Sequence, residues 1–238
     1  MIAPLLLYSR IAARNVRRNI RRSSYAAAAV SAGVVCLLVF QALKVGLHDE
    51  MVASTLLLET GSMQIHAGAF RPGLSAITPL PDLSTAERAL SRVGTTTFAP
   101  RLRTTALAST GSDGTMLQIT GVDPQREQRV TTILQRTVRG RPSGNGEILV
   151  GEEFARTLHL AVGDELDLTA QDVTGDAVTR SWRIGGMYRT ALGSFDRTRA
   201  YVLLSELEDF LGVDGPAEIA VKTNPAEDGP MLAALRQA

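Results

Sequence analysis

The chain has 238 residues, of which 45% are hydrophobic and 21% are charged, so it is long enough to bury a sizeable core. Its 25 basic and 24 acidic residues nearly balance, which excludes a uniformly basic nucleic-acid-binding protein and an acidic disordered chain. The single cysteine excludes a disulfide framework and any zinc or iron–sulfur site built from cysteines.

The charges are unevenly distributed along the chain. No acidic residue precedes Asp49, and the basic residues before it are six arginines and Lys44. The arginines are Arg10, Arg14, Arg17, Arg18, Arg21 and Arg22. From Asp49 onward there are 18 basic and 24 acidic residues, so a basic arm precedes an acidic remainder.

An uncharged apolar run, residues 25–43, lies between these two parts. As a helix at about 1.5 Å per residue it nearly spans a hydrocarbon core of roughly 30 Å, and we predict a transmembrane helix. The small residues Ala29 and Gly33 would allow another membrane helix to pack closely. A buried helix of a soluble protein is one alternative. A cleaved signal peptide is another, disfavoured because the apolar run is long and no small-x-small site follows it.

Residues 1–24 predict a cytoplasmic, basic, amphipathic helix. On a helical wheel one face carries Leu5, Tyr8, Ala12, Val16 and Ile20, and the six arginines lie opposite. This pattern is typical of a helix in the membrane interface. We therefore assign all six arginines to the interface with membrane lipids. The positive-inside rule places the N-terminus in the cytoplasm and the residues after about 45 on the outer side. The alternative for the arm is nucleic-acid binding, which we do not expect beside a membrane helix.

The remainder predicts an α+β fold of many short strands and helices, with a helical stalk at 44–60 and a core domain at 61–238. The domain is either single or two-lobed, with the second lobe roughly at 161–195. Alternation of apolar and polar residues predicts a strand at 62–67, and residues 147–150 predict a short buried strand. Further strands are predicted at 98–109, 116–122, 165–169, 178–188, 199–204 and 217–222. Helices are predicted at 85–93 with Ser84 as N-cap, at 125–136, 152–160 and 205–211, and from Met231.

No combination of side chains predicts a metal or phosphate site. The three histidines, His48, His66 and His159, lack a second ligand at metal spacing. The chain has no G-x-S-x-G nucleophile motif and no glycine-rich phosphate loop followed by Lys-Ser/Thr, so we expect no ATP hydrolysis by this chain alone. We predict no enzyme, no cofactor and no metal site.

Two further pairs of charged residues are assigned structural roles. Asp164 and Asp196 follow turns, where hydrogen bonding to the turn is a commoner role for aspartate than catalysis. Arg101 and Arg103 alternate on one face of a predicted strand, and we expect that face to be solvated rather than to clamp a ligand.

A series of short strings runs in order through the chain. They are IAARNVRRN (11–19), GSMQIH (61–66), GVDP (121–124), GR followed by EILVG (140–151), a segment ending in VGD (158–164), and GGMY followed by Asp196 (185–196). In this order they resemble permeases of the MacB/LolC/LolE/FtsX type, whose outer part is a MacB-like periplasmic core domain. One departure is Leu192, which follows Ala191 where the family often has glycine.

The resemblance implies a permease of the bacterial inner membrane that pairs with a cytoplasmic ABC ATPase subunit and with a second permease copy or paralogue. ATP hydrolysis would belong to that separate subunit. The two-lobed outer domain would be a mechanical coupler that acts on a periplasmic carrier or substrate protein. Family members export macrolides or peptides, release lipoproteins or control cell-wall hydrolases. The amino-acid sequence of residues 63–66 favours lipoprotein release.

One feature departs from this family. Its members have four membrane helices, whereas this sequence predicts one, so we expect an incomplete permease; a truncated gene, a split permease and a fragment are all open. The alternative function is a single-pass, membrane-anchored, extracytoplasmic binding or sensor domain. A third hypothesis, an anchored hydrolase, is disfavoured because no nucleophile–base motif is found.

Overall fold

The computed structural model describes Arg14 and residues 17–55, 61–66, 78–92, 97–111, 113–142 and 144–223. The chain divides into two compact units, Met1–Ala53 and Ser54–Ala238. The predicted helix from Met231 and most of the predicted arm lie outside the described residues.

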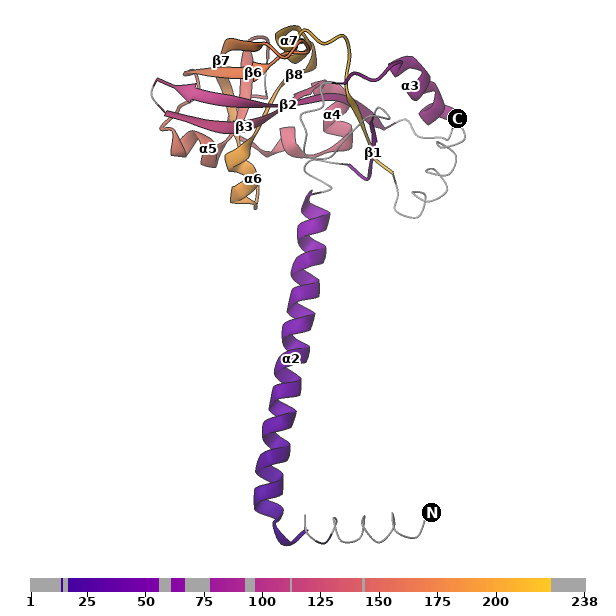
Figure 1. The fold of residues 1–238 in the computed structure, drawn as a ribbon, viewed down its shortest axis with the longest axis vertical. Helices are drawn as coiled ribbons and strands as arrows, with labels where there is room; N and C mark the ends of the chain where they lie inside the picture. The colour runs from indigo at the N-terminus through magenta and orange to yellow at the C-terminus, as the bar shows by residue number, and fades with distance from the viewer. Residues whose placement is uncertain are drawn as a thin grey trace. The chain divides into compact units, whose positions relative to one another are not determined.

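The first unit is dominated by one long helix, α2 (Ile20–Thr55), shown in Figure 1. Its alanine-rich start favours a helix because alanine loses no side-chain entropy there, and no proline interrupts it. The segment Ile20–Lys44 is long and apolar enough to cross a membrane by length and composition, and it contains the predicted span 25–43. The helix continues through Thr55, so it also covers most of the predicted stalk.

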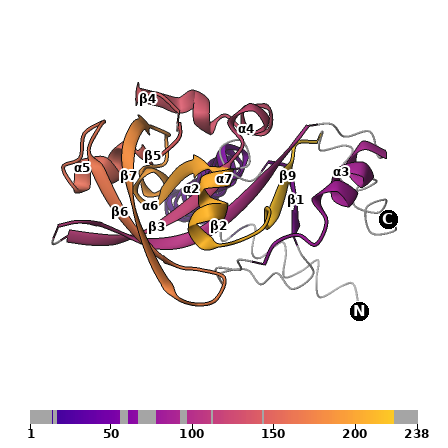
Figure 2. The ribbon, with the colours of Figure 1, turned by 90° about the horizontal axis from the view of Figure 1, so that it is seen from above.

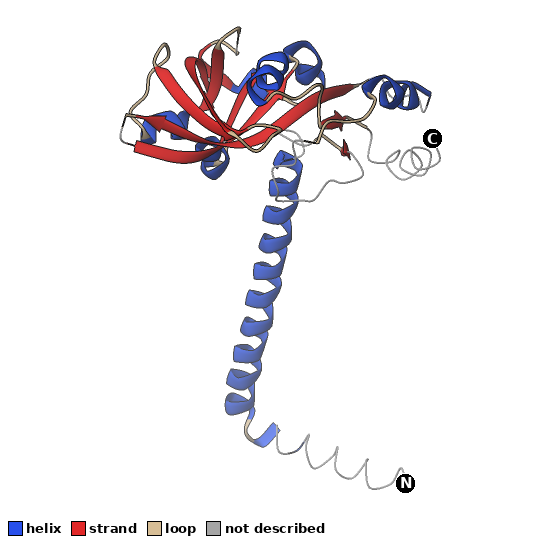
Figure 3. Cartoon of the chain, turned by 45° about the horizontal axis from the view of Figure 1, so that its top comes forward, coloured by secondary structure: helices blue, strands red, loops and turns tan. Residues whose placement is uncertain are grey.

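The second unit is built on one nine-stranded sheet in the described part of the chain. Six of its strands pair in a closed ring, which we call the barrel: each pairs with the next, and the last pairs again with the first. In ring order they are β2 (Phe98–Thr110), β3 (Asp113–Val122), β8 (Arg199–Leu203), β5 (Glu147–Gly151), β7 (Ala177–Tyr188) and β6 (Glu165–Gln171). The strands are red in Figure 3.

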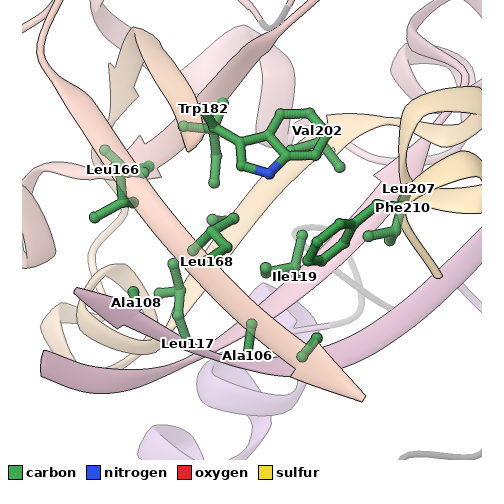
Figure 4. Packing of buried hydrophobic residues seen from close by; sticks show 14 of the residues in the cluster. Ala106, Ala108, Leu117, Ile119, Leu166, Leu168, Trp182, Val202, Leu207 and Phe210 are labelled. Atoms are coloured by element: carbon green, nitrogen blue, oxygen red, sulfur yellow. The ribbon is translucent and has the colours of Figure 1, made fainter. Parts of the chain in front are cut away.

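Alternate residues of the barrel strands point inward and form the main core. Trp182 is the largest of them, and its ring meets Phe210 edge-on at 6.3 Å between centroids. Figure 4 shows Trp182 beside Leu168, Ile119 and Phe210 in this interior. Phe210 belongs to α7 (Leu204–Leu211), which packs on β3, β2, β8 and β7. The barrel is therefore a packed core rather than a channel.

A smaller sheet extends from one end of β2. The first four residues of β2 pair with β9 (Glu218–Val221), which pairs in turn with β1 (Met63–His66). The helix α3 (Leu83–Arg92) belongs to this region, where Leu90 packs with Ile219 and Val221. Because β2 belongs to both the small sheet and the barrel, it connects them directly (Figure 2).

Short elements cover the outside of the barrel. Two helical elements follow β3 in the chain, and a short strand pairs with β7 at residues 186–188, beyond the stretch that pairs with β6. A second core cluster on this side contains Tyr188, Phe195 and Tyr201, with Tyr188 in edge-on contact with both other rings. The elements are α4 (Pro124–Val130), the 3-10 helix η2 (Ile133–Arg136), β4 (Thr137–Gly140), α5 (Glu152–Thr157) and α6 (Gly193–Thr198).

Most predicted elements are present within a few residues, with four differences. Residues 125–136 are not one helix, because the chain becomes extended at Thr131 and starts again as η2. Neither β4 nor α6 was predicted from the sequence. The side chain that accepts from the first turn of α3 is Asp82 rather than Ser84. Residues 161–195, expected as a second lobe, contribute β6 and β7 to the barrel and share its core.

Candidate functional site

The apolar window of α2 is not buried by any part of the described structure. Val34, Leu37 and Leu38 are 50–66% exposed, although such side chains in a water-soluble unit are normally buried. Ala29 is also exposed, and a Cβ added at Gly33 would meet no atom within 4 Å. This surface can therefore accept lipid chains or a closely packed helix.

The predicted membrane-interface arginines are exposed wherever the structure describes them. Arg10 lies outside the described residues. The exposed ones are Arg14, Arg17, Arg18, Arg21 and Arg22. The structure places them before the apolar window or in its first turns, so their assignment to a lipid interface stays a prediction.

A buried ionic cluster lies where the small sheet meets the barrel. Arg101 of β2 is only 1% exposed and donates two hydrogen bonds to the Glu127 carboxylate, from Nε at 2.9 Å and from Nη2 at 2.6 Å. Its Nη1 lies 3.4 Å from Oε1 of Glu218 on β9. Because Glu127 lies on α4, a single guanidinium connects β2, α4 and β9.

Further side chains complete the Arg101 cluster around the same two carboxylates. Arg103 Nε lies 3.3 Å from Glu218 Oε2, and Gln64 Nε2 donates to Glu218 Oε1 at 2.9 Å. The Thr131 hydroxyl donates to Glu127 Oε1 at 2.5 Å. The cluster consists of Arg101, Glu127, Glu218, Arg103, Gln64 and Thr131. Bonds to several donors reduce the free-energy cost of burying the carboxylates.

The pKa values of two basic groups reflect these surroundings. Burial by itself lowers the pKa of the Arg101 guanidinium, but the charges of Glu127 and Glu218 outweigh this effect and raise that pKa above its ordinary value. For His66 at the end of β1, burial lowers the pKa below its ordinary value. The Glu218 carboxylate opposes that shift and Arg103 adds to it. His66 Nε2 also lies 3.4 Å from Gln64 Oε1.

The expectation that Arg101 lies on a solvated face is wrong. It does share a face with Arg103, since both contact Glu218, but α4 and β9 cover that face at Arg101. Strand periodicity correctly places the two arginines on one face of the strand, but it does not reveal which elements pack on that face. A weak signal for this burial was available: Glu218 follows Ala217 and precedes Ile219, Ala220 and Val221, an unusual place for a charge without a partner.

Two of the strings that resemble the permease family meet at one place on the barrel. Gly140 of β4 pairs with Gly186 of β7, and the Arg141 amide donates to the Gly185 carbonyl at 3.1 Å. A Cβ at Gly186 would lie 2.1 Å from the Arg141 carbonyl oxygen, so only glycine allows this approach. Arg141 Nη2 in turn pairs with Glu147 Oε1 at 2.7 Å.

Gly151, at the end of β5, approaches α6 in the same way. A Cβ at this position would lie 1.8 Å from the Asp196 carbonyl oxygen. The Asp196 side chain is 3% exposed and accepts hydrogen bonds from the Thr190 amide and hydroxyl, at 2.9 and 2.7 Å. Asp164 accepts from the Ala161 amide at 2.8 Å. Both aspartates make the turn hydrogen bonds expected from their positions.

The described residues do not assemble an arrangement typical of catalysis or metal binding. Among them, no three His, Cys, Asp or Glu side chains gather as a metal-binding group. The buried charges that the structure does gather, in the Arg101 cluster, are paired with one another. This arrangement can fix the relative positions of strands, which is a structural rather than a chemical capability.

Comparison with known proteins identifies the family. The model of the MacB-like periplasmic core domain matches residues 23–238. No curated protein matches the sequence. The periplasmic region of MacB from Actinobacillus actinomycetemcomitans has a similar fold, with a TM-score of 0.50 and 12% identity over 75% of this chain and 85% of that one.

A second solved structure has a lower TM-score. It is the extracellular domain of the noncanonic ABC-type transporter YknZ from Gram-positive bacteria, with a TM-score of 0.44 and 12% identity over 64% of this chain and 84% of that one. The family match spans most of α2 and the whole described part of the strand-rich unit. The chain belongs to the family of MacB-like periplasmic core domains.

Proposed function

We propose that this chain is a permease subunit of an ATP-driven ABC transporter in the bacterial inner membrane. In this proposal α2 crosses the membrane and the strand-rich unit works in the periplasm. The observation that carries the proposal is the family match over residues 23–238, which includes an apolar helix of membrane-spanning length together with the periplasmic core domain. The fold shared with the periplasmic region of MacB supports it.

Association with a cytoplasmic ABC ATPase is the direct consequence to test. The full chain should be tagged and purified from membranes solubilised in mild detergent, and co-purifying proteins should be identified by mass spectrometry. Recovery of an ATPase subunit is the expected result. Recovery of the chain without any ATPase, from membranes in which the ATPase is present, would contradict the proposal.

A second permease copy or paralogue is the other proposed partner. Ala29, Gly33 and Cys36 lie four and three residues apart, so they share one face of α2, and Cys36 is exposed. If the small residues permit close packing, mild oxidation of membranes should crosslink two chains through Cys36. Gly33→Leu should abolish the crosslink. Val34→Leu, which changes a neighbouring face, is the matched control and should keep it.

The orientation rests on the arginines before the apolar window and in its first turns. In an anionic inner leaflet each contributes roughly 1 kcal/mol of attraction, so several together can hold the N-terminus in the cytoplasm. Replacing Arg17, Arg18, Arg21 and Arg22 with glutamate should scramble the topology, measured by protease protection of the strand-rich unit. Glutamates at the exposed Arg129 and Arg136 are the control. Unchanged topology in the first variant would refute this role.

We further propose that the strand-rich unit transmits ATPase-driven motion mechanically to a substrate or periplasmic partner. The support is β2, which belongs to both the small sheet and the barrel, and the Arg101 cluster, which fixes the junction. A movement of one part is then passed to the other rather than absorbed between them. Within this class the residue string of β1 favours lipoprotein release, and depletion of the chain should then retain lipoproteins in the inner membrane.

The alternative is a membrane-anchored binding or sensor domain. The observation that favours it is a groove of about 800 Å³ beside β2 and β6, large enough for a ligand. The two functions are separated by the ATPase experiment, since a sensor domain needs no ATPase subunit.

A further inference from the structure

The barrel wall opens between two of its strands. β2 pairs with β9 at Phe98–Arg101 and with β6 at Leu107–Ser109. Between these stretches, at residues 104–106, β2 pairs with β3 on one edge, and no described strand pairs with the other. The groove of about 800 Å³ lies at this opening. It is lined by β2, β6 and the turn that joins β6 to β7, together with Met116 of β3, Ala177 of β7 and Thr78.

The lining combines hydroxyl groups with an apolar rim. Five of the lining residues are threonines, namely Thr78, Thr104, Thr105, Thr169 and Thr174. Leu107, Met116 and Val173 also line the groove, and they are 44–58% exposed. They are three of the five large apolar side chains exposed on the described part of the strand-rich unit, so apolar exposure is concentrated here.

The charge of the lining limits the ligands it can take. None of the described residues that line the groove is basic, and Asp172 is the acidic one. A hydrogen bond from the Thr174 hydroxyl lowers the pKa of the Asp172 carboxyl, which keeps it negatively charged. An anionic ligand would find no opposite charge in this lining. The groove therefore suits an uncharged or cationic ligand.

The backbone of β2 presents hydrogen-bonding groups to the same opening. The carbonyl of Arg101 accepts from the Ala217 amide at 3.0 Å, so it faces the β9 edge. In a regular strand the N–H and C=O groups of every second residue face the same edge. Thr105, four residues on, therefore directs its N–H and C=O toward the groove.

We propose that this groove binds an extended, uncharged or cationic polypeptide segment of a partner protein, which adds as a strand to β2 at residues 104–106. Its main chain pairs with Thr105, and its apolar side chains pack on Leu107 and Met116. The proposal depends on the geometry of the barrel and not on association with an ATPase, so either can fail without the other.

The probe is a capped peptide of alternating threonine and valine with a lysine at each end, titrated by calorimetry into the full chain in nanodiscs. Saturable binding is expected. Thr105→Pro removes one N–H from the groove edge and should weaken binding about tenfold, as should Leu107→Ser. The matched controls are Val138→Ser and Val162→Ser, at exposed valines outside the groove lining, and they should bind as the unsubstituted chain does.

Two altered peptides distinguish strand addition from non-specific binding. Methylating alternate backbone nitrogens blocks main-chain pairing and should abolish binding, whereas glutamates in place of the lysines should weaken it. Equal binding of the methylated peptide, displacement of the probe by neutral lipid vesicles, or no saturable binding would overturn the proposal. If Thr105→Pro lowers the thermal midpoint of the chain, Leu107→Ser and the methylated peptide decide the outcome.

Discussion

The two units of this chain place the same kinds of side chain in opposite surroundings. In α2, Val34 and Leu38 are 50% and 64% exposed, whereas Ile148, Leu149 and Val150 of β5 are completely buried. The strand-rich unit builds its own apolar interior. The helix instead presents an apolar surface in all directions, which is stable when a lipid bilayer supplies the surroundings.

The arginines show the same contrast. Those beside the apolar window of α2 are exposed, while Arg101 is buried between two carboxylates on other elements. The role of an arginine in this protein therefore depends on the residues around it and not on residue type alone. The contrast can be tested in both units, because each offers a substitution and a matched control.

The largest effect is expected from Arg101→Met. It leaves Glu127 and Glu218 buried without their shared cation, which should lower the free energy of unfolding by about 3–5 kcal/mol. Denaturant unfolding of the full chain in detergent measures this. Arg88→Met is the control: Arg88 lies 3.9 Å from Asp82 with both side chains more than half exposed, and the loss should stay below about 1 kcal/mol. Equal losses of unfolding free energy in the two variants would contradict the expected difference between a buried and an exposed arginine.

Val34→Arg tests the other unit, in which α2 is proposed to span the membrane. A charge at the centre of a spanning helix should cost about 3 kcal/mol of insertion free energy, so the fraction of chain that resists alkaline extraction from membranes should fall. The control is Val162→Arg on the strand-rich unit, where the side chain is 43% exposed, and it should not change that fraction. If Val34→Arg inserts normally, α2 is not a membrane span.

Gly151→Ala tests the close packing of β5 against α6. The added Cβ would overlap the Asp196 carbonyl oxygen, so the backbone must shift. The free energy of unfolding should therefore fall by about 2–3 kcal/mol. Gly193→Ala is the matched control, since a Cβ there would meet nothing within 4 Å, and its effect should lie within about 0.5 kcal/mol. A thermal-shift series on both variants distinguishes them.

The smallest effect is a pH dependence at His66. Burial lowers its pKa in the folded chain, so the unfolded chain binds more protons between the folded pKa and 6.5. Stability should therefore rise with pH through that interval and be lost as pH falls through it. His66→Gln should flatten this part of the curve. A curve unaffected by His66→Gln would contradict the prediction.

Local patterns predicted much of the fold correctly. Strands were predicted at 98–109 and 116–122 and are present as β2 and β3, and the uncharged run at 25–43 predicted a long apolar helix. These features depend on neighbours a few residues apart, which the sequence displays directly. β4 was missed because Thr137–Gly140 is short and mostly exposed, so it lacks the alternation that marks a half-buried strand.

The sequence by itself determined the helix, the strands, the charge asymmetry and the series of family strings. Only the tertiary structure revealed the closure of the barrel, the place of residues 161–195 within it and the burial of Arg101. The physical reason is the distance along the chain between the groups concerned: Arg101 is 26 residues from Glu127 and 117 from Glu218. Periodicity assigns a side chain to a face, but the energy of a buried charge depends on which distant groups cover that face.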